Sequence, residues 1–484
     1  MTTTNNKPQK ILITTAIDYA NSVIHVGHAY EKILADCMAR YYRKLIGPEN
    51  VFFVTGTDEH GTSTYKAAQK AGEPVEEYTK KVSQEDKEQI DSLDISYDRF
   101  ICTTNEDHKK VASEFFEKAL KTGAIYKGKY EGLYCEGCEA YKTLTELDEN
   151  GKCPFHVSRE IQKVEEENYF LKWSDFAEDL KKLIEQKDFI LPETRKNEML
   201  GFLTQGLQDL PVSRPKYKVP WGIPVPSDEE QVIYVWYDAL VNYYTAAKPK
   251  GFWEDDVKIV HFVGKDILRW HSLLWPAMLM NLGLRLPNTI YTHGFVNLDG
   301  QKISKSLGNV IYPKDLVEKY GVDAVRYYFL KHGPITEDVD ISLAHFEEVY
   351  NADLANGLGN TVARIAKMAQ NSGIKFKLED SANIGDSGNI WDSTWATPLT
   401  KFRADLALQN IWNMLSHLDK HINENEPWGQ KDPKKLEEIL SFEVNSVRYI
   451  AQVLEPFLPS TSKKIQEQYQ MKGITTTNAL FPRL

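Results

Sequence analysis

The stretch KILITTAIDYANSVIHVGHAYEKILADCMARYYRKL, residues 10–45, combines an apolar strand-like run, a polar turn and a helix-like pattern. The run at 10–17 predicts a buried β-strand, and apolar residues then recur at helical spacing from residue 28. His25 and His28 lie in the turn between them. The start of a helix leaves backbone N–H groups without helical partners, so such a turn can bind an anion, and histidines add donors. Taken alone, the stretch is more typical of a turn with surface or capping histidines.

Two later stretches repeat this pattern. VFFVTGTDEHG at 51–61 and VKIVHFVGKD at 257–266 are β-rich runs that end in polar turns, and the second leads into the apolar helix-like run ILRWHSLLWPAMLM. Strands that alternate with helices predict an α/β fold with a parallel sheet, whose ligands bind beyond the carboxyl ends of the strands. His25, Asp58 and Asp266 all follow such strand ends.

The 484 residues predict several domains, roughly three at about 100 to 200 residues each. The parallel sheet is expected from two separate parts of the chain, 1–105 and 233–298, interrupted by an insertion at 106–232. A loop region follows at 299–343. From 344 to 484 the strand signals disappear and long helical patterns predict an all-α domain.

The composition is that of a soluble globular protein, with 42% hydrophobic and 26% charged residues. No uncharged apolar run of about 18 residues occurs, and the N-terminal MTTTNNKPQK lacks the features of a signal or transit peptide. We therefore expect a cytoplasmic protein without a membrane partner. The net charge of −11 is a weak argument against nucleic-acid binding, because the distribution of Lys and Arg matters more than their sum.

The stretch CEGCEAYKTLTELDENGKCPFH, residues 135–156, has the spacing of a zinc knuckle or ribbon. Cys135, Cys138, Cys153 and His156 form a C-x₂-C and a C-x₂-H pair. Four protein ligands leave no open position on the metal, so we expect one structural Zn²⁺.

A second informative loop is DGQKISKSLGN at 299–309, in which Gly300 and Gly308 flank Lys302 and Lys305. Two lysines in a glycine-flanked loop suit a mobile clamp on a triphosphate. A lone loop of this kind is usually only solvated, but here it follows the histidine turn in chain order.

The histidine turn and the KISKS loop together resemble the signature pair of class I aminoacyl-tRNA synthetases. The resemblance extends to the methionyl-tRNA synthetase family and runs from about residue 10 to the C-terminal ALFPRL. The stretches that carry it, in the family's order, are YANSVIHVGHAY, TGTDEHGT, YVWYDALVNYY, VGKDILRWHSLLWPAMLM, HGFVNLDGQKISKSLGN and NENEPW.

This resemblance implies a Rossmann-like catalytic domain that activates methionine with ATP and transfers it to the 3′ end of tRNA(Met), including the initiator tRNA. The reaction needs charge stabilisation and alignment rather than a protein nucleophile, and Mg²⁺ would arrive with the ATP phosphates. The implied catalytic and ATP-binding residues are His25, Gly27, His28, Asp266, Lys302 and Lys305.

The family's methionine pocket maps onto an apolar, aromatic set of residues. Sulfur packs well against aromatic rings, and the Asp58 carboxylate would hold the ammonium group. The sequence departs from relatives at Leu240, where some have proline, and at Ile303, where the signature has methionine. The implied pocket residues are Ile17, Tyr19, Asp58, Trp236, Ala239, Leu240, Tyr243, Ile267 and His271.

The helical domain resembles the family's anticodon-binding domain. Asn360 and Arg364 lie four residues apart, hence on one helical face, and would read base edges, while Trp428 would stack on a base. The alternative for Trp428 is an aromatic plug after a helix. A monomer is expected, because some relatives dimerise through a further C-terminal domain that does not follow FPRL here.

Three other functions compete with this interpretation. The cysteine enzyme of the same class uses zinc to bind its substrate and needs an open metal position, whereas this ligand set is closed. The large editing insertions of the leucine, isoleucine and valine enzymes would not fit in 106–232. A non-catalytic tRNA-binding paralogue is disfavoured because His25, His28, Asp58 and Lys305 are intact.

Overall fold

The computed structural model describes residues 9–138, 140–142, 144–155, 159–303, 308–377, 393–470 and 473–484. These residues form two compact units that interleave in sequence. The first contains residues 1–24, 42–91 and 96–294, and the second contains 25–41, 92–95 and 295–484. Helix α1 (Val26–Ile46) therefore begins in the second unit and ends in the first.

Six of the described strands form the parallel sheet of the first unit, in the order β3-β2-β1-β12-β13-β7. Strand β2 is buried along its whole length and β12 along nearly all of it. Burial on both faces agrees with the adjacent apolar residues VFFV in β2 and IV and FV in β12, where a one-sided strand would alternate. The strands are β1 (Lys10–Tyr19), β2 (Val51–Asp58), β3 (Arg99–Cys102), β7 (Ile190–Leu191), β12 (Val257–Gly264) and β13 (Thr289–His293).

The sheet confirms the α/β prediction and adds one feature that local patterns did not reveal. The short strand β7 belongs to the insertion, yet it pairs with β13 at the edge of the parallel sheet. The helices of this unit are α2 (Thr62–Ala71), α3 (Val75–Ser92, which ends in the second unit), α4 (Glu106–Lys121), α5 (Ala177–Glu185), α6 (Glu193–Thr204), α7 (Val235–Leu240), α8 (Asn242–Ala247), α9 (Trp275–Asn281) and the π-helical η5 (Trp270–Leu274).

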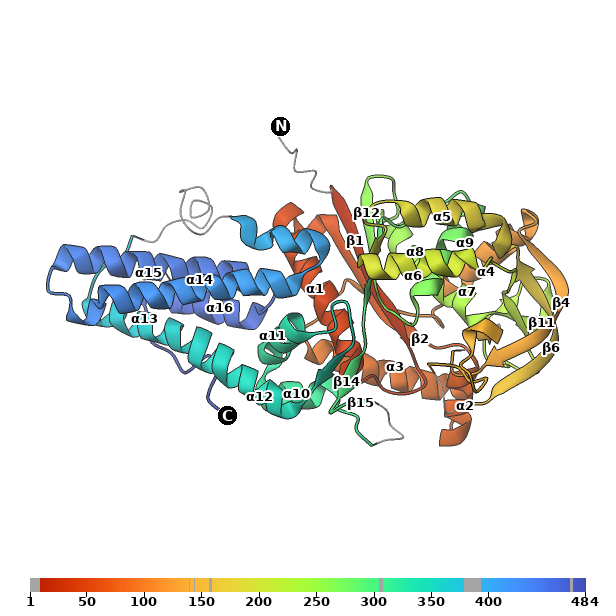
Figure 1. Cartoon of the computed structure of the whole chain (residues 1–484), viewed down its shortest axis with the longest axis horizontal. Coiled ribbons are helices and arrows are strands. Elements are labelled where there is room, and N and C mark those ends of the chain that lie inside the picture. Colours follow the sequence, from red (N-terminus) through yellow and green to blue (C-terminus); the bar gives the residue numbers. More distant parts are fainter. Residues whose placement is uncertain are drawn as a thin grey trace. The chain divides into compact units, whose positions relative to one another are not determined.

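The insertion is built on a long antiparallel hairpin, seen at the edge of the first unit in Figure 1. Strand β4 (Ile125–Cys135) pairs along its whole length with β6 (Ile161–Leu171), and β5 and β8 complete that sheet. Strands β9, β10 and β11 form a second small sheet. The remaining strands of the insertion are β5 (Ala140–Lys142), β8 (Leu210–Pro211), β9 (Ser213–Pro215), β10 (Pro224–Val225) and β11 (Asp228–Ile233).

The second unit is mostly helical, and its C-terminal part agrees with the helical pattern expected from residue 344. Helices α13, α14, α15 and α16 lie side by side as a bundle (Figure 1). The helices are α10 (Pro313–Tyr320), α11 (Val322–His332), α12 (Leu343–Val349), the π-helical η7 (Tyr350–Gly359), α13 (Asn360–Ser372), α14 (Ala404–Asn425), α15 (Pro433–Leu454) and α16 (Pro459–Gln468).

The second unit also contains strands. One small sheet has the order β15-β14-β16, formed by Gln301–Lys302, Val296–Leu298 and Val339–Ile341. A short pair, β17 (Tyr469–Gln470) and β18 (Gly473–Ile474), lies within the region expected to be entirely helical. That expectation was therefore too strict, because two-residue strands are too short to give a periodic signal.

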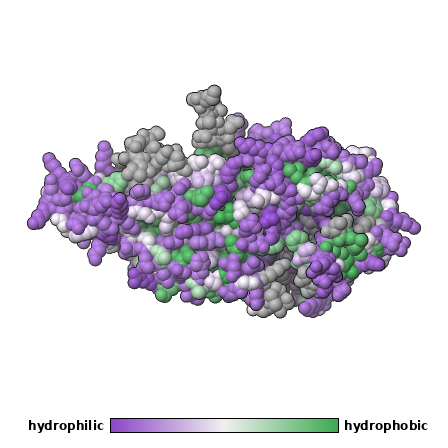
Figure 2. Space-filling model, viewed as in Figure 1, coloured by the Kyte–Doolittle hydropathy of each residue, from purple (hydrophilic) through white to green (hydrophobic). Residues whose placement is uncertain are grey.

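The face shown in Figure 2 is mostly hydrophilic, with scattered hydrophobic patches rather than a continuous apolar band. Among the described residues, no helix is both long enough and apolar enough to cross a membrane.

Candidate functional site

The histidine turn lies at the start of α1, in the second unit. The Gly27 N–H donates to Nδ1 of His25 at 3.1 Å, and the His25 N–H donates to Nδ1 of His28 at 3.2 Å. A neutral ring whose Nδ1 accepts a hydrogen bond carries its proton on Nε2. Nδ1 of His28 also lies 3.3 Å from the carbonyl of His25, so these two contacts suit either tautomer of His28, whereas the bond from Gly27 leaves His25 with an Nε2–H donor. The turn therefore holds two imidazoles, with centroids 4.3 Å apart, that can donate to phosphate oxygens.

The backbone of this turn is already engaged with protein acceptors. The N–H of Val26 donates to the carbonyl of Ile311, and the N–H of His28 donates to the carbonyl of His25, both at 2.9 Å. With Gly27 bonded to the His25 ring, the first three N–H groups of the helix have partners. An anion here would therefore be held by the imidazole rings more than by the backbone, which differs from the simple helix-terminus expectation.

The segment around the KISKS loop adjoins the histidine turn within the second unit. A Cβ on Gly27 would lie 3.8 Å from Cδ1 of Ile303, and Ile311 accepts the hydrogen bond from Val26. Gly300 and Gly308 both have positive φ, of 74° and 69°, so the predicted flanking glycines adopt backbone conformations that favour glycine.

The structure describes only part of the predicted lysine clamp. The backbone of Lys302 ends β15 and pairs with Asn297. Lys305 lies in 304–307, outside the described residues.

The predicted methionine pocket lies in the first unit, at the carboxyl ends of β1 and β2. Tyr19 and Asp58 are paired neighbours on these two strands. The Asp58 side chain is buried and accepts a hydrogen bond from Oγ1 of Thr103 at 3.4 Å. Glycine at position 56 allows β3 to pack closely against β2, because a Cβ there would overlap the Ile101 carbonyl. The parallel register thus presents a buried carboxylate beside an aromatic ring.

Aromatic rings form one wall near these strand ends. Trp236 on α7 meets Tyr19 edge-on, with centroids 6.1 Å apart, and stacks on Trp270 at 5.1 Å. Ala239 and Leu240 follow on the same helix and are buried. Rings held in this way suit the apolar side chain and polarizable sulfur of methionine.

Tyr243 and His271 form a buried polar pair near this wall. Nδ1 of His271 lies 3.0 Å from the carbonyl of Ile267, which can only accept, so Nδ1 carries the proton and Nε2 accepts from the Tyr243 hydroxyl at 2.8 Å. The hydrogen-bond pattern thus fixes the neutral tautomer of His271. His271 belongs to the π-helical segment η5, a rare geometry that often occurs at functional sites.

Asp266 is exposed at the turn after β12. A Cβ on Gly264 would lie 2.7 Å from Oδ1 of Asp266, so the glycine leaves room for the carboxylate. The N–H of Lys265 donates to the carbonyl of His293 at 3.0 Å and fixes the turn.

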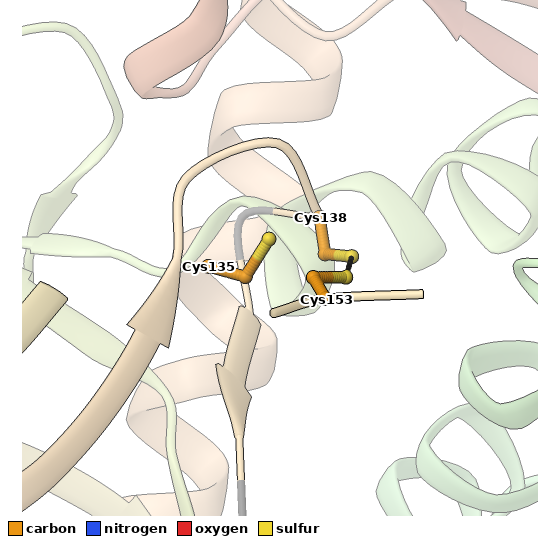
Figure 3. A group of neighbouring side chains, drawn as sticks. All are labelled: Cys135, Cys138 and Cys153. Carbon is orange, nitrogen blue, oxygen red and sulfur yellow. Dashed lines mark hydrogen bonds between the residues drawn. The ribbon is translucent and has the colours of Figure 1, made fainter. Parts of the chain in front are cut away.

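Three cysteines of the predicted metal site converge in the insertion (Figure 3). The sulfurs of Cys135, Cys138 and Cys153 all lie within 4.8 Å of one another, and Cys138 and Cys153 are 3.4 Å apart. Zn–S bonds of about 2.3 Å in a tetrahedron place sulfurs roughly 3.8 Å apart. The three thiols therefore fit a zinc ion with small adjustments. His156 lies outside the described residues.

Without a metal, the surroundings of Cys138 favour its neutral thiol. The hydrogen bond with Cys135, together with burial, raises the pKa of the Cys138 thiol. A divalent metal reverses this preference, because coordination deprotonates the thiols.

The predicted anticodon-reading residues lie together in the second unit. Trp428 is 58% exposed, and the guanidinium carbon of Arg364 lies 5.0 Å from its ring centroid. Nη2 of Arg364 also donates to Asn423 at 3.0 Å. Asn360 is exposed at the first position of α13. The exposure of Trp428 argues against the aromatic-plug alternative.

Sequence reasoning missed the buried groups that hold these residues in place. Asp238 forms hydrogen bonds with His60 and His108, which lie 178 and 130 residues away in the chain. The backbone carbonyl of Cys138 accepts a hydrogen bond from the indole N–H of Trp236. The available signals were a charged residue within the apolar WYDAL and a histidine directly after Asp58–Glu59.

The chain is similar to a known family, to named proteins and to solved structures. Residues 11–163 and 155–366 match the family model described as tRNA synthetases class I (M). A protein from Caldanaerobacter subterraneus subsp. tengcongensis named methionine–tRNA ligase is 40% identical over 96% of this chain and 74% of the relative. One of the same name from Nostoc is 37% identical over 96% of this chain and 90% of the relative.

The structural comparison agrees with these matches. Mycobacterium tuberculosis methionyl-tRNA synthetase, solved in complex with methionyl-adenylate, superposes with a TM-score of 0.88 at 32% identity, covering 98% of this chain and all of that one. The fold and the sequence matches thus define a class I tRNA synthetase. The chain belongs, within that class, to the methionyl-tRNA synthetase family.

Proposed function

We propose that this chain activates L-methionine with ATP to methionyl-adenylate and pyrophosphate, and then transfers methionine to the 3′ end of tRNA(Met). The methionine carboxylate attacks the α-phosphate of ATP, pyrophosphate leaves, and a terminal ribose hydroxyl of tRNA then displaces AMP. The reaction requires alignment and charge stabilisation, so no protein nucleophile takes part. Mg²⁺ would accompany the ATP phosphates.

The observation that carries this proposal is the pairing of the two signature segments in the second unit. The histidine turn and the chain on both sides of 304–307 lie together, through Gly27 beside Ile303 and the hydrogen bond from Val26 to Ile311. We assign the imidazoles of His25 and His28 to the phosphates as ring N–H donors. Lys302 and Lys305 would neutralise charge as pyrophosphate leaves, and Asp266 would help to hold the nucleotide.

Methionine recognition is assigned to the first unit. The buried Asp58 carboxylate would bind the ammonium group, since a charge-assisted hydrogen bond is strongest away from water. Trp236 and Tyr243 would contact the thioether side chain.

The cysteine cluster would bind one structural zinc ion with His156 as the fourth ligand. When bound, the metal ties the end of β4 to the segment that contains Cys153. Four protein ligands leave no site for a substrate, so the ion would stabilise the insertion rather than take part in chemistry.

An ATP–pyrophosphate exchange assay with each of the twenty amino acids tests this function. We expect exchange with methionine, and Lys305→Ala should lower the rate by about 10² to 10³, as for loss of one preorganised electrostatic contact. A Lys305→Ala rate within threefold of wild type would refute the role of that lysine. Exchange with another amino acid in preference to methionine would refute the substrate assignment.

The Asp58→Asn variant tests whether Asp58 contributes to the binding of methionine rather than of ATP. It should weaken methionine binding far more than ATP binding. An equal loss for both would show that Asp58 does not hold the ammonium group.

A further inference from the structure

A buried carboxylate bridges two imidazoles in the first unit. Oδ2 of Asp238 lies 2.6 Å from Nδ1 of His60, and Oδ1 lies 2.7 Å from Nε2 of His108. Asp238 and His108 are fully buried and His60 is 4% exposed. Both carboxylate oxygens are thus engaged by short hydrogen bonds that water does not screen.

The three residues come from three segments of the chain, two of which adjoin or carry residues of the proposed methionine pocket. His60 follows Asp58 by two residues at the end of β2. Asp238 lies on α7, between Trp236 and the pair Ala239–Leu240. His108 lies on α4 and links this bridge to a helix that supplies none of the proposed pocket residues. The carboxylate therefore connects the strand end that carries the ammonium partner to the helix that carries the apolar wall.

The two imidazoles determine the charge of the Asp238 carboxylate. Burial alone would raise the pKa of Asp238, but the charge and N–H groups of His60 and His108 lower it to about 2. The carboxylate is therefore ionised at neutral pH and accepts from both rings. The rings are also held on other sides, because Oγ1 of Thr245 lies 3.3 Å from Nδ1 of His108 and the His60 ring meets Trp221 edge-on at 5.5 Å.

We propose that Asp238 is a positioning residue that, through His60 and His108, fixes Asp58 relative to the Trp236–Leu240 wall and so sets the affinity for methionine. This inference rests on the proposed function and deepens it. Asp238 itself does not touch substrate. Its loss should change how well the pocket fits methionine, while the groups assigned to ATP remain in place.

The first test is Asp238→Asn, which keeps the shape but removes the charge and one acceptor. An amide can accept from only one of the two rings and must present its NH₂ group to the other. We expect the methionine Kd, measured by calorimetry, to rise about tenfold or more, as for loss of a hydrogen bond to a charged group. The ATP Kd should stay within about twofold of wild type, and kcat at saturating substrates within about threefold.

A matched pair at His108 separates hydrogen bonding from simple packing. In His108→Gln the amide nitrogen can take the place of Nε2 and donate to Asp238, whereas His108→Leu removes the donor at similar bulk. We expect the Gln variant to bind methionine within about twofold of wild type and the Leu variant to lose about tenfold. The same contrast should hold for His60→Asn and His60→Leu, because the Asn amide can replace Nδ1.

The outcomes distinguish this inference from the proposed function. Wild type without methionine-dependent exchange rejects the function itself. Wild-type exchange with unchanged methionine affinity in Asp238→Asn and His108→Leu rejects only the positioning role. Parallel losses of methionine and ATP affinity would also overturn it, since they indicate general disruption. If Asp238→Asn fails to fold, the His108 and His60 pairs decide the question.

Discussion

The indole N–H of Trp236 donates to the backbone carbonyl of Cys138 at 3.3 Å. Trp236 belongs to the aromatic wall of the proposed methionine pocket, and Cys138 belongs to the cysteine cluster of the insertion. The position of the cysteine turn therefore helps to orient a pocket residue. A second link to the insertion is an ion pair, in which Nη1 of Arg269, on the segment after β12, lies 2.5 Å from Oε1 of Glu146.

Removal of the proposed zinc should therefore weaken methionine binding even if zinc never contacts substrate. In chelator-treated protein or in Cys138→Ser, we expect the methionine Kd to rise about threefold to tenfold, the worth of one hydrogen bond. The ATP Kd should be unchanged in equilibrium dialysis. Trp236→Phe in untreated protein is the matched control, since it keeps a ring but lacks the N–H donor, and should reproduce the effect. Normal methionine affinity in verified metal-free protein would contradict the link.

Gly27→Ala should impair activity without destabilising the fold. The added Cβ would lie 2.7 Å from Cε1 and 2.9 Å from Nδ1 of the His25 ring, so the ring must swing away from its place in the turn. We expect the pyrophosphate exchange rate to fall about tenfold to 100-fold, with a melting temperature near wild type.

Gly201→Ala provides the control for Gly27→Ala. Gly201 is exposed on α6, and a Cβ there would meet no atom within 4 Å. It should leave exchange unchanged and stabilise the helix by about 0.5 to 1 kcal/mol. Normal exchange in Gly27→Ala would show that the His25 geometry is not needed.

The sequence predicted those parts of the fold that depend on local patterns. Strands β1, β2 and β12 and helices α14 and α15 follow from apolar runs and helical periodicity, and the spacing of Cys135, Cys138 and Cys153 predicted that they would converge. The short edge strand β7 gave no such signal, since its pairing with β13 depends on tertiary structure.

The connections that hold the site together could not be predicted, because they join residues far apart in the chain. The bond from Trp236 to Cys138 spans 98 residues and the one from His60 to Asp238 spans 178. The two π-helical segments, η5 and η7, were expected to be ordinary helices. Apolar periodicity does not distinguish α- from π-helical hydrogen bonding, which is decided by packing.

Glu443 should make the helical bundle less stable as pH rises. Burial, only partly offset by the charge of Arg364, raises the pKa of this carboxyl from 4.5 to about 8. The folded state therefore binds the proton more tightly than the unfolded state, so this stabilisation is complete below pH 4.5 and is lost as pH rises towards 8. Glu443→Gln should remove this dependence and raise the free energy of unfolding at pH 8 by roughly a few kcal/mol.

Urea titrations of the full chain between pH 5 and pH 8.5 measure this effect. Glu437→Gln on the same helix is the control, because Glu437 is exposed and its replacement should leave the pH profile unchanged. Identical profiles for wild type and Glu443→Gln would contradict the role of burial.

Trp428→Ala should impair tRNA charging while leaving amino-acid activation intact. The ring is 58% exposed and lies against the Arg364 guanidinium, so it is available to stack on a base. Loss of one stacking contact costs about 1 to 3 kcal/mol, or roughly 5- to 150-fold in kcat/KM for tRNA. Exchange of pyrophosphate with ATP and methionine needs no tRNA and should remain near wild type.

Trp428→Phe distinguishes stacking from structural support. Phenylalanine retains an aromatic face, so charging should recover most of the loss seen with alanine. Changing the anticodon away from CAU should reduce charging by wild type severely and by Trp428→Ala less, because part of the discriminating contact is already absent. A lowered melting temperature with loss of helical circular dichroism in Trp428→Ala would instead show that the ring supports the bundle. Base reading would then rest on Asn360 and Arg364, which lie one helical turn apart on α13.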